Sequence, residues 1–342
     1  MASVTVANGG GNYSASTTWD VARLITAADD VVVTGTSGQL TIDQTTNDCR
    51  SADFTGYTGT LSFTASKFLN IGTATTGPAG LALRFIPGQV LSFGASSRIQ
   101  FVSTTTGNLV TWAGASLSCL LVFNGVGGGW TLQDAMTLTA NLSLSAGTLD
   151  TNGQTITTSA QFSSSNPGVT RVLTLGTTTI NSSNVGSAWT MAGSALTINA
   201  TSSTLNFSGA TVTFAGGGFT YGTVNFTGTG TDIITGANTF TALSRSNAAA
   251  CALTLPASVT TTVTTVTLVG TPGNILTLAS STGGTAAPLV IGSGTVRFNH
   301  CSIKDLACSG GATFEAYDCK NVSGNTGITF KSPATLGLCG VG

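Results

Sequence analysis

The sequence predicts an all-β protein of the parallel β-helix, or β-solenoid, class, with atypical N- and C-terminal capping segments. Short runs in which apolar residues alternate with Thr or Ser recur about every 8–12 residues between turn signals, as strands do. A period of two is that of a half-buried strand, and β-branched Thr and Val suit a pleated surface better than a helix. Only 7 % of the 342 residues are charged, against roughly 25 % in an ordinary soluble domain.

The low charge of the chain excludes several classes of protein. The 11 Lys and Arg residues face 12 Asp and Glu residues, for a net charge of −1, so nothing attracts a polyphosphate and no nucleic-acid partner is expected. With 41 % hydrophobic residues, the chain is not a disordered, self-repelling polymer. No stretch approaches the roughly 20 apolar residues that span a bilayer, so we expect no membrane insertion.

The N-terminal residues contain the one helical pattern and no targeting signal. The opening MASVTVANGGGNYS has neither a basic start nor an apolar core, so we expect no signal peptide and synthesis in a cytoplasm. Residues 16–28 (STTWDVARLITAA) predict a short helix, whereas residues 31–33 predict a strand. Asp29 and Asp30 precede that strand, where turn hydrogen bonds account for them without catalysis.

The middle of the chain predicts short strands joined by tight turns. Ala146-Gly147 and Asn152-Gly153 are two of the turn signals between them. Three Gly-Gly-Gly runs are also expected to be turns, because none has the Lys-Ser/Thr ending or the following helix of a phosphate loop. These runs are Gly9–Gly11, Gly127–Gly129 and Gly216–Gly218. The predicted strands include residues 136–139, 142–144, 148–150, 154–157, 172–175, 196–198, 204–207 and 211–214.

Two architectures share this pattern, an antiparallel sandwich or barrel and a parallel solenoid. The spacing stays even along most of the chain, and charges are absent from residues 172–231 and 246–296. Stacked coils place equivalent side chains about 4.8 Å apart, where like charges repel but hydroxyls hydrogen-bond. We therefore favour a solenoid with roughly 22–28 residues per coil, whose alternating Leu, Ile, Val and Phe side chains point inward.

The two ends of the chain differ from its middle. Residues 1–60 hold Trp19 and eight of the charged residues, and residues 297–342 hold four of the seven Cys, the single His and the single Glu. Because the ends of a solenoid expose sheet edges that must be covered, we expect three parts. Residues 1–60 form an N-terminal cap or attachment segment, residues 61–296 the β-solenoid body, and residues 297–342 the C-terminal coils and cap.

The carboxylates are too sparse for a convincing catalytic pair. Glycoside hydrolysis needs two of them about 5–9.5 Å apart, one with a raised pKa. Asp232 is the only carboxylate between Asp150 and Asp305, so the long middle offers no pair. Asp305 and Glu315 are the best pair available, since one turn of a coil could bring them together. We expect them to be solvated charges on a cap, and assign no catalytic residue.

Seven cysteines, an odd number, rule out a complete set of intrachain disulfides. His300, Cys301, Cys308 and Cys319 have metal-binding side chains, but their spacing does not match the close pairs of a zinc site. We expect buried thiols that stack at equivalent positions of successive coils or form one disulfide, and we assign neither metal nor cofactor. The seven are Cys49, Cys119, Cys251, Cys301, Cys308, Cys319 and Cys339.

The large aromatic residues could bind sugars by stacking, or could pack in the interior of the solenoid. Core packing is the expectation, because solenoid interiors also stack aromatic rings. The candidates are Trp112, Trp130, Trp189, Tyr57 and Tyr221.

Several segments carry a resemblance to known proteins. They are residues 9–20 (GGGNYSASTTWD), 27–31 (AADDV), 49–61 (CRSADFTGYTGTL), 147–156 (GTLDTNGQTI), 162–166 (FSSSN), 303–305 (IKD), 310–316 (GGATFEA) and 324–330 (GNTGITF). Together they resemble a family of Gly/Thr/Ser-rich β-solenoid proteins encoded by tailed phages and environmental viral contigs, over about residues 5–330. Three features depart from the family. Tyr13 stands where members usually have Trp, Ile328 stands where their ending GNNTGW.F has Trp, and a Cys-containing tail follows Phe330.

The resemblance implies a virion structural protein, such as a fibre, a tail-associated protein or a head-surface component, made in the host cytoplasm and without enzymatic activity. The partners we expect are other virion proteins and a host surface glycan. Low charge and exposed Thr and Ser faces also permit lateral packing of identical chains, as in a trimer. Two alternatives stay open: a polysaccharide-degrading tailspike and a bacterial β-solenoid surface adhesin.

Overall fold

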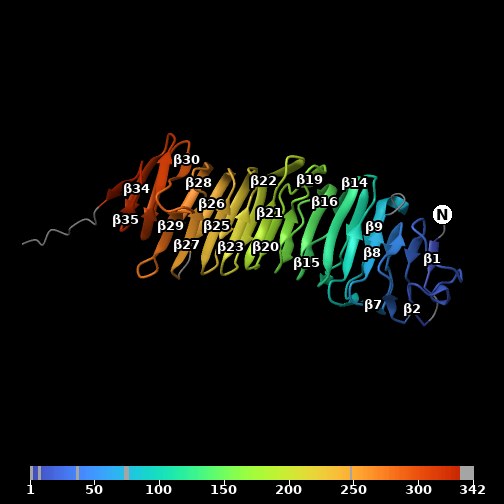
Figure 1. Cartoon of the computed structure of the whole chain (residues 1–342). Coiled ribbons are helices and arrows are strands. Elements are labelled where there is room, and N and C mark those ends of the chain that lie inside the picture. The colour runs from blue at the N-terminus through green and yellow to red at the C-terminus, as the bar shows by residue number, and fades with distance from the viewer. Residues whose placement is uncertain (1–2, 7–8, 36–37, 73–76, 247–248, 332–342) are drawn as a thin grey trace, which may run out of the picture. The chain divides into compact units, whose positions relative to one another are not determined.

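The predicted fold class is confirmed by a computed structural model, in which parallel strands stack into a β-solenoid. The structure describes residues 3–6, 9–35, 38–72, 77–246 and 249–331. The chain divides into two compact units, unit 1 (Met1–Asn206) and unit 2 (Phe207–Gly342). In both units the strands lie side by side and pair in parallel with the strands of the neighbouring coils (Figure 1).

Unit 1 is built from short strands and two short 3-10 helices, η1 (Ser16–Thr18) and η2 (Pro78–Gly80). Its strands are β1 (Ser3–Thr5), β2 (Gly11–Asn12), β3 (Asp30–Val32), β4 (Leu40–Ile42), β5 (Asn47–Cys49), β6 (Ser51–Asp53), β7 (Thr60–Phe63), β8 (Phe68–Ile71), β9 (Leu81–Arg84), β10 (Val90–Phe93), β11 (Arg98–Phe101), β12 (Asn108–Thr111), β13 (Ser116–Leu117), β14 (Leu120–Leu132), β15 (Met136–Leu138), β16 (Leu142–Asp150), β17 (Ile156–Thr158), β18 (Phe162–Ser164), β19 (Arg171–Thr174), β20 (Thr179–Ser182), β21 (Gly186–Met191) and β22 (Leu196–Phe207).

Unit 2 repeats the same construction with somewhat longer strands. They are β23 (Val212–Ala215), β24 (Thr220–Phe226), β25 (Thr231–Thr235), β26 (Thr239–Ser246), β27 (Cys251–Leu255), β28 (Thr261–Val269), β29 (Leu276–Ser280), β30 (Ala287–Ile291), β31 (Thr295–Asn299), β32 (Cys301–Lys304), β33 (Leu306–Ser309), β34 (Thr313–Tyr317), β35 (Lys320–Ser323) and β36 (Thr329–Lys331).

The core of each unit consists of inward-pointing apolar side chains that stack in register, which confirms the predicted alternation. One such row in unit 1 consists of Leu69, Ile99, Leu121, Leu142, Phe162 and Trp189. A row in unit 2 contains Leu253, Leu278 and Ile303. All of these side chains are buried, and each such burial contributes roughly 1.5–3 kcal/mol. The core therefore runs from coil to coil, and a coil has no separate core of its own.

The predicted helix and three of the predicted turns differ from the structure. The segment 16–28 is helical only at η1. Residues 142–144 and 148–150 form one strand, β16, and Gly127–Gly129 lie inside β14, where the register with β16 shifts. Gly147 has a φ of 81°, and a Cβ there would lie 2.4 Å from the carbonyl oxygen of Gly125. These glycines bend a strand that keeps pairing, so a turn signal in the sequence did not end the strand. Residues 196–198 and 204–207 likewise join, as β22.

Coil lengths vary more widely than the even sequence pattern predicts. The coil that leads from Leu69 to its level partner Ile99 is longer than the expected range, whereas the coil from Ile303 to its level partner Asn321 is shorter. The longest coils occur in the part of unit 1 where an additional four-stranded sheet, with the order β10-β7-β4-β2, adds a side to the coil. The division into cap, body and C-terminal coils stays a prediction, since residues 3–60 and 297–331 also contain stacked parallel strands.

Candidate functional site

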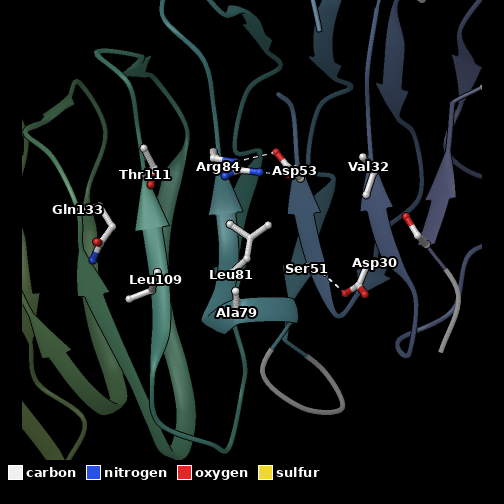
Figure 2. A pocket seen from close by; sticks show the side chains of 11 residues that line it. Asp30, Val32, Ser51, Asp53, Ala79, Leu81, Arg84, Leu109, Thr111 and Gln133 are labelled. Carbon is white, nitrogen blue, oxygen red and sulfur yellow. Dashed lines mark hydrogen bonds and ion pairs between the residues drawn. The ribbon is translucent and has the colours of Figure 1, made fainter. Parts of the chain in front are cut away.

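A groove of about 460 Å³ crosses the outer face of unit 1, over β1, β3, β6, β9, β12 and the end of β14 (Figure 2). Its volume lies within the range of small-molecule sites in proteins. Because the strands stack, the groove crosses them, and it is lined by outward-pointing side chains of successive coils. These side chains form two rows.

The first row, called here the carboxyl-side row, lies toward the carboxyl ends of the strands. Its members are Val32, Asp53, Arg84, Thr111 and Gln133. Val32 is level with Asp53, Asp53 with Arg84, and Arg84 with Thr111. The N–H of Gln133 then donates to the carbonyl oxygen of Val110, which places Gln133 in the next coil. Figure 2 shows Val32, Asp53, Arg84 and Thr111 side by side along this row.

The second row, called the amino-side row, lies two residues earlier on the same strands, or three residues earlier in β9, where the register with β12 shifts. It contains Ser3, Asp30 and Ser51, which pair in register, followed by Leu81 and Leu109, which also pair. Leu81 and Leu109 are half-buried although they point outward. In the other described strands, most outward positions carry Thr, Ser or Asn. The groove is therefore polar at one end of this row and apolar at the other.

Both carboxylates of the groove are held by arginines. Nε of Arg84 donates to Oδ1 of Asp53 at 3.0 Å, and Nε of Arg50 donates to Oδ1 of Asp30 at 2.8 Å. Burial opposes ionisation of Asp53, but hydrogen bonds from Arg84 and Thr55 outweigh it and lower the pKa of that carboxyl. The same contact raises the pKa of Arg84. The Arg84 side chain nevertheless stays 48 % exposed, against 13 % for Asp53.

This arrangement suits binding better than acid–base chemistry. A general acid for glycoside hydrolysis needs a carboxyl with a raised pKa, and the pKa of Asp53 is shifted the other way. Arg84 and Gln133 present N–H donors, and Thr111 presents a hydroxyl. Leu81 and Leu109 supply an apolar patch beside them. The groove can therefore take an extended, neutral ligand that has hydroxyl groups and apolar faces.

Asp305 and Glu315, the best predicted catalytic pair, are not brought together. Asp305 is buried, and its Oδ2 accepts the N–H of Gly284 at 2.8 Å. Glu315 in β34 lies level with Arg297 in β31. Its carboxylate contacts Arg297, Lys331 and the hydroxyl of Tyr317. The Tyr317 hydrogen bond is the first cause of a lowered pKa for Glu315. Asp305 accepts a hydrogen bond from a turn, and Glu315 contacts cationic side chains of neighbouring coils. The two carboxylates therefore have separate structural partners.

Asp29 forms turn hydrogen bonds, as predicted. Asp30 is not a turn residue, because it belongs to a strand. Oδ2 of Asp29 accepts the N–H and the hydroxyl of Thr26, both at 2.8 Å, and the Arg23 guanidinium donates to the same carboxylate. The hydrogen bond from Arg23 lowers the pKa of Asp29 to about 2. Asp30 belongs to strand β3 and lines the groove, so the strand begins one residue earlier than predicted.

Six of the seven cysteines lie in the described residues, and five of these six are buried. Cys319 is half-exposed and Cys339 lies outside the described residues. Burial raises the pKa of Cys119 and of Cys308 to about 12. His300 is a turn residue with a φ of 49° that directly precedes Cys301 at the start of β32. Cys301 and Cys319 do stack, whereas Cys308 lies in another row, level with Leu289.

The candidate sugar-stacking aromatics are core residues, as expected. All five are buried: Trp112, Trp130, Trp189, Tyr57 and Tyr221. Aromatic rings of neighbouring coils pack on one another in the core; Phe101, for example, stacks on Phe123 with centroids 4.9 Å apart. None of the five lines the groove.

Two buried arginines were missed in the sequence, one in each unit. In unit 2, Nε of Arg245 lies 2.8 Å from Oδ2 of Asp232, and both side chains are almost completely buried. Arg245 also donates to the carbonyl oxygens of Gly228 and Gly230, and Asp232 accepts the N–H of Val212. Burial raises the pKa of Asp232 to about 6 against the opposing effect of Arg245. Arg171 and Arg245 each stand at the edge of a long uncharged stretch. This isolation was the sequence signal that could have identified them as buried charges.

Arg171 is the buried arginine of unit 1, and its partners are neutral. Its guanidinium donates to the carbonyl oxygens of Val169 and Ala192 and to Oγ of Ser164, at 2.9–3.1 Å. Among the described residues no carboxylate forms an ion pair with it, and burial lowers the pKa of Arg171. Three hydrogen bonds therefore hold this guanidinium in place of a counter-charge.

The sequence did not predict the groove. The alternation of apolar and polar residues predicts which side chains point outward, but it does not predict which outward side chains of different coils lie next to each other. Asp53 and Arg84 belong to successive coils and are far apart in the sequence, and Thr111 lies a further coil away. The available signal was the apolar residue at outward positions, at Val32, Leu81 and Leu109. Register alone brings these residues together.

Within the described ranges, no helix has the length and apolar character needed to cross a membrane, and no three His, Cys, Asp or Glu side chains gather as a metal site would require. Comparisons of the chain with protein-family models, with curated proteins and with solved structures gave no match.

Proposed function

We propose that the chain is a structural component of a virion: a fibre, tail-associated or head-surface β-solenoid, made in the host cytoplasm, that displays a neutral surface and contacts a host glycan. The virion assignment rests on the sequence resemblance to proteins of tailed phages, and the solenoid fold is compatible with it. Other virion proteins and further copies of the chain are the remaining partners of this proposal.

The observation that carries the structural role is how the charged groups are used. Asp53 is tied to Arg84, Asp232 to Arg245, and Glu315 to Arg297. These three carboxylates, which would have to change protonation state if they took part in acid–base catalysis, are held in ion pairs. The remaining outer positions are largely hydroxyl and amide side chains, which give a stable scaffold and not a reactive surface.

The groove of unit 1 is the place where we propose that the glycan binds. Sugar hydroxyls can donate to Asp53 and accept from Arg84 and Gln133, and the apolar faces of sugar rings can lie on Leu81 and Leu109. Neighbouring coils repeat the polar positions about every 4.8 Å. A linear oligosaccharide that crosses the strands would therefore meet a new set of side chains at each coil.

Location in the particle tests the virion role directly. An antibody raised against the chain is applied to density-purified phage particles, and the same particles are analysed by mass spectrometry. Labelling of particles at one defined position, with the chain at constant stoichiometry, is the expected result. Recovery of the chain from bacterial surfaces, with none in particles, would favour the adhesin alternative and contradict the proposal.

Glycan binding is tested with host polysaccharide fragments in isothermal titration. Gln133→Ala, in an exposed side chain, and Arg84→Ala should each weaken binding about tenfold, the effect of losing one hydrogen bond to a polar group. Thr174→Ala, outside the groove, is the matched control. New reducing ends that appear with the wild type and vanish in Asp53→Asn would replace this proposal with the degrading tailspike.

A further inference from the structure

Cys301 and Cys319 occupy equivalent positions in successive coils of unit 2. Ser302 in β32 pairs with Lys320 in β35. The residues that precede them, Cys301 and Cys319, are therefore also level with each other. Both cysteines follow a residue with a left-handed backbone, His300 with a φ of 49° and Asp318 with a φ of 50°. The same turn is therefore used twice, one coil apart.

The two thiols also have matching surroundings. Sγ of Cys301 donates to the carbonyl oxygen of Asn299 at 3.2 Å, and Sγ of Cys319 donates to that of Tyr317 at 3.1 Å. Asn299 and Tyr317 are themselves level. In addition, the N–H of Cys301 donates to Sγ of Cys319 at 3.2 Å. The sulfur of Cys319 thus reaches the backbone of the partner cysteine in the coil before.

We propose that Cys301 and Cys319 form a disulfide on exposure to an oxidising environment, and that this bond ties the coil of β35 and β36 to the coil before it. In-register residues of neighbouring parallel strands lie about 4.8 Å apart, within the range of roughly 4.4–6.8 Å between the Cα atoms of disulfide-bonded cysteines. A change of side-chain rotamer brings the two sulfurs together without moving the backbone far.

The two cysteines have different parts in the reaction with a small disulfide such as oxidised glutathione. The Cys319 thiolate attacks one sulfur of the oxidant, breaks its S–S bond and releases one glutathione thiolate. The Cys301 thiolate then attacks the Cys319 sulfur of this mixed disulfide and releases the second. Two protein thiols are oxidised, one small disulfide is reduced, and the two thiol protons end on the released glutathione molecules.

Exposure and acidity assign these parts. Cys319 is half-exposed, whereas Cys301 is buried. The hydrogen bond with Cys301 lowers the pKa of Cys319 to about 7, and the same contact raises the pKa of Cys301. Thiolate is the attacking form, so the accessible, more acidic thiol reacts first.

Cys251 provides an internal comparison, because it belongs to the same row. Cys251 is level with Leu276, and Leu276 with Cys301. One apolar residue therefore separates Cys251 from Cys301, at twice the coil spacing, or about 10 Å. This exceeds the distance that a disulfide can bridge without backbone movement.

The test is oxidation of the folded full chain with oxidised glutathione, followed by non-reducing peptide mapping. A peptide linked through Cys301 and Cys319 is expected in the wild type and in Cys251→Ser, Cys308→Ser and Cys339→Ser. Cys301→Ser should trap a glutathione adduct on Cys319, because the attacking thiol remains but the resolving thiol is lost. Cys319→Ser should leave Cys301 unmodified.

Hydrogen exchange measures what the bond does. Opening of residues 320–331 should slow on the order of a hundredfold in the oxidised wild type, since the disulfide closes a short loop, and exchange in unit 1 should not change. A link from Cys319 to Cys339, a stable glutathione adduct in the wild type, or two free thiols after oxidation would each overturn the proposal.

Discussion

Two stretches of the chain differ in whether their outward side chains are charged. The coils of unit 1 between residues 23 and 84 contain three ion pairs, Arg23–Asp29, Arg50–Asp30 and Arg84–Asp53. Residues 246–296 of unit 2 contain no charged side chain at all. Their outward positions form neutral rows, such as Ala252 and Thr277 in register.

The difference shows what a stacked row permits. A side chain has neighbours of the same row about 4.8 Å away on both sides, so like charges in adjacent coils repel and opposite charges attract. Asp53 beside Arg84, and Glu315 beside Arg297, follow this rule. The charged coils satisfy it by alternating signs, and the uncharged coils satisfy it with hydroxyls. The groove of unit 1 lies on the charged coils, with Asp30, Asp53 and Arg84 among its lining residues.

The largest effect is expected at the buried pair of unit 2. Arg245→Met would leave Asp232 buried without its counter-charge, which should lower the free energy of unfolding by about 3–5 kcal/mol. Urea denaturation followed by hydrogen exchange in unit 2 measures this loss. The double variant Arg245→Met with Asp232→Leu should recover most of it, since Asp232 shares its row with Leu253. Equal losses in the single and double variants would contradict the charge argument.

Acid should weaken the charged coils selectively. The pKa of Asp29 is about 2 in the folded chain, below the ordinary value of about 4, so its ionised form stabilises the fold above pH 4. That contribution is lost as the pH falls from about 4 to 2. Arg23 is 41 % exposed, so solvent screening limits the contribution to about 1 kcal/mol.

The variant Asp29→Asn checks this pH window. It should be less stable than the wild type at pH 7 and equally stable below pH 2, as measured by urea denaturation at each pH. A constant difference between the two proteins across this range would show that ionisation of Asp29 has no part in the stability.

A reversed sign in the carboxyl-side row should cost about 1 kcal/mol. Arg84→Glu places a carboxylate beside that of Asp53 and removes its partner. Thr111→Glu is the matched control, because the new carboxylate lies beside Arg84 and should change stability by less than about 0.5 kcal/mol. Thermal unfolding of both variants at low salt compares them. Equal destabilisation would show that charge order in the row is irrelevant.

Much of the fold was predictable from the sequence, but little of the groove was. Alternation at Leu142, Leu144 and Leu149 predicts inward apolar side chains without knowledge of their neighbours. Register between coils is not a local property: Asp53 meets Arg84 only because the intervening coil has one particular length. The glycine at Gly147 looked like a turn because a local rule cannot tell a strand-ending turn from a bend that keeps its pairing.

The smallest effect on stability is expected at Thr174, a neutral position next to the charged Asp150. Thr174 lies between Asp150 and Asn199 in one outward row of unit 1. Thr174→Lys places an ammonium beside Asp150, whereas Thr174→Glu places a second carboxylate there. The lysine variant should be more stable than the glutamate variant by about 0.5 kcal/mol at low salt, since the pair is partly exposed.

Salt separates this charge effect from side-chain size and strand propensity. Raising the ionic strength to about 1 M shortens the screening length to roughly 3 Å, less than the spacing between coils, so the difference between the two variants should nearly vanish in urea denaturation. A difference that persists in high salt would come from packing of the longer side chains. In that case hydroxyls fill the uncharged rows because they fit, and charge repulsion between coils would not explain their choice.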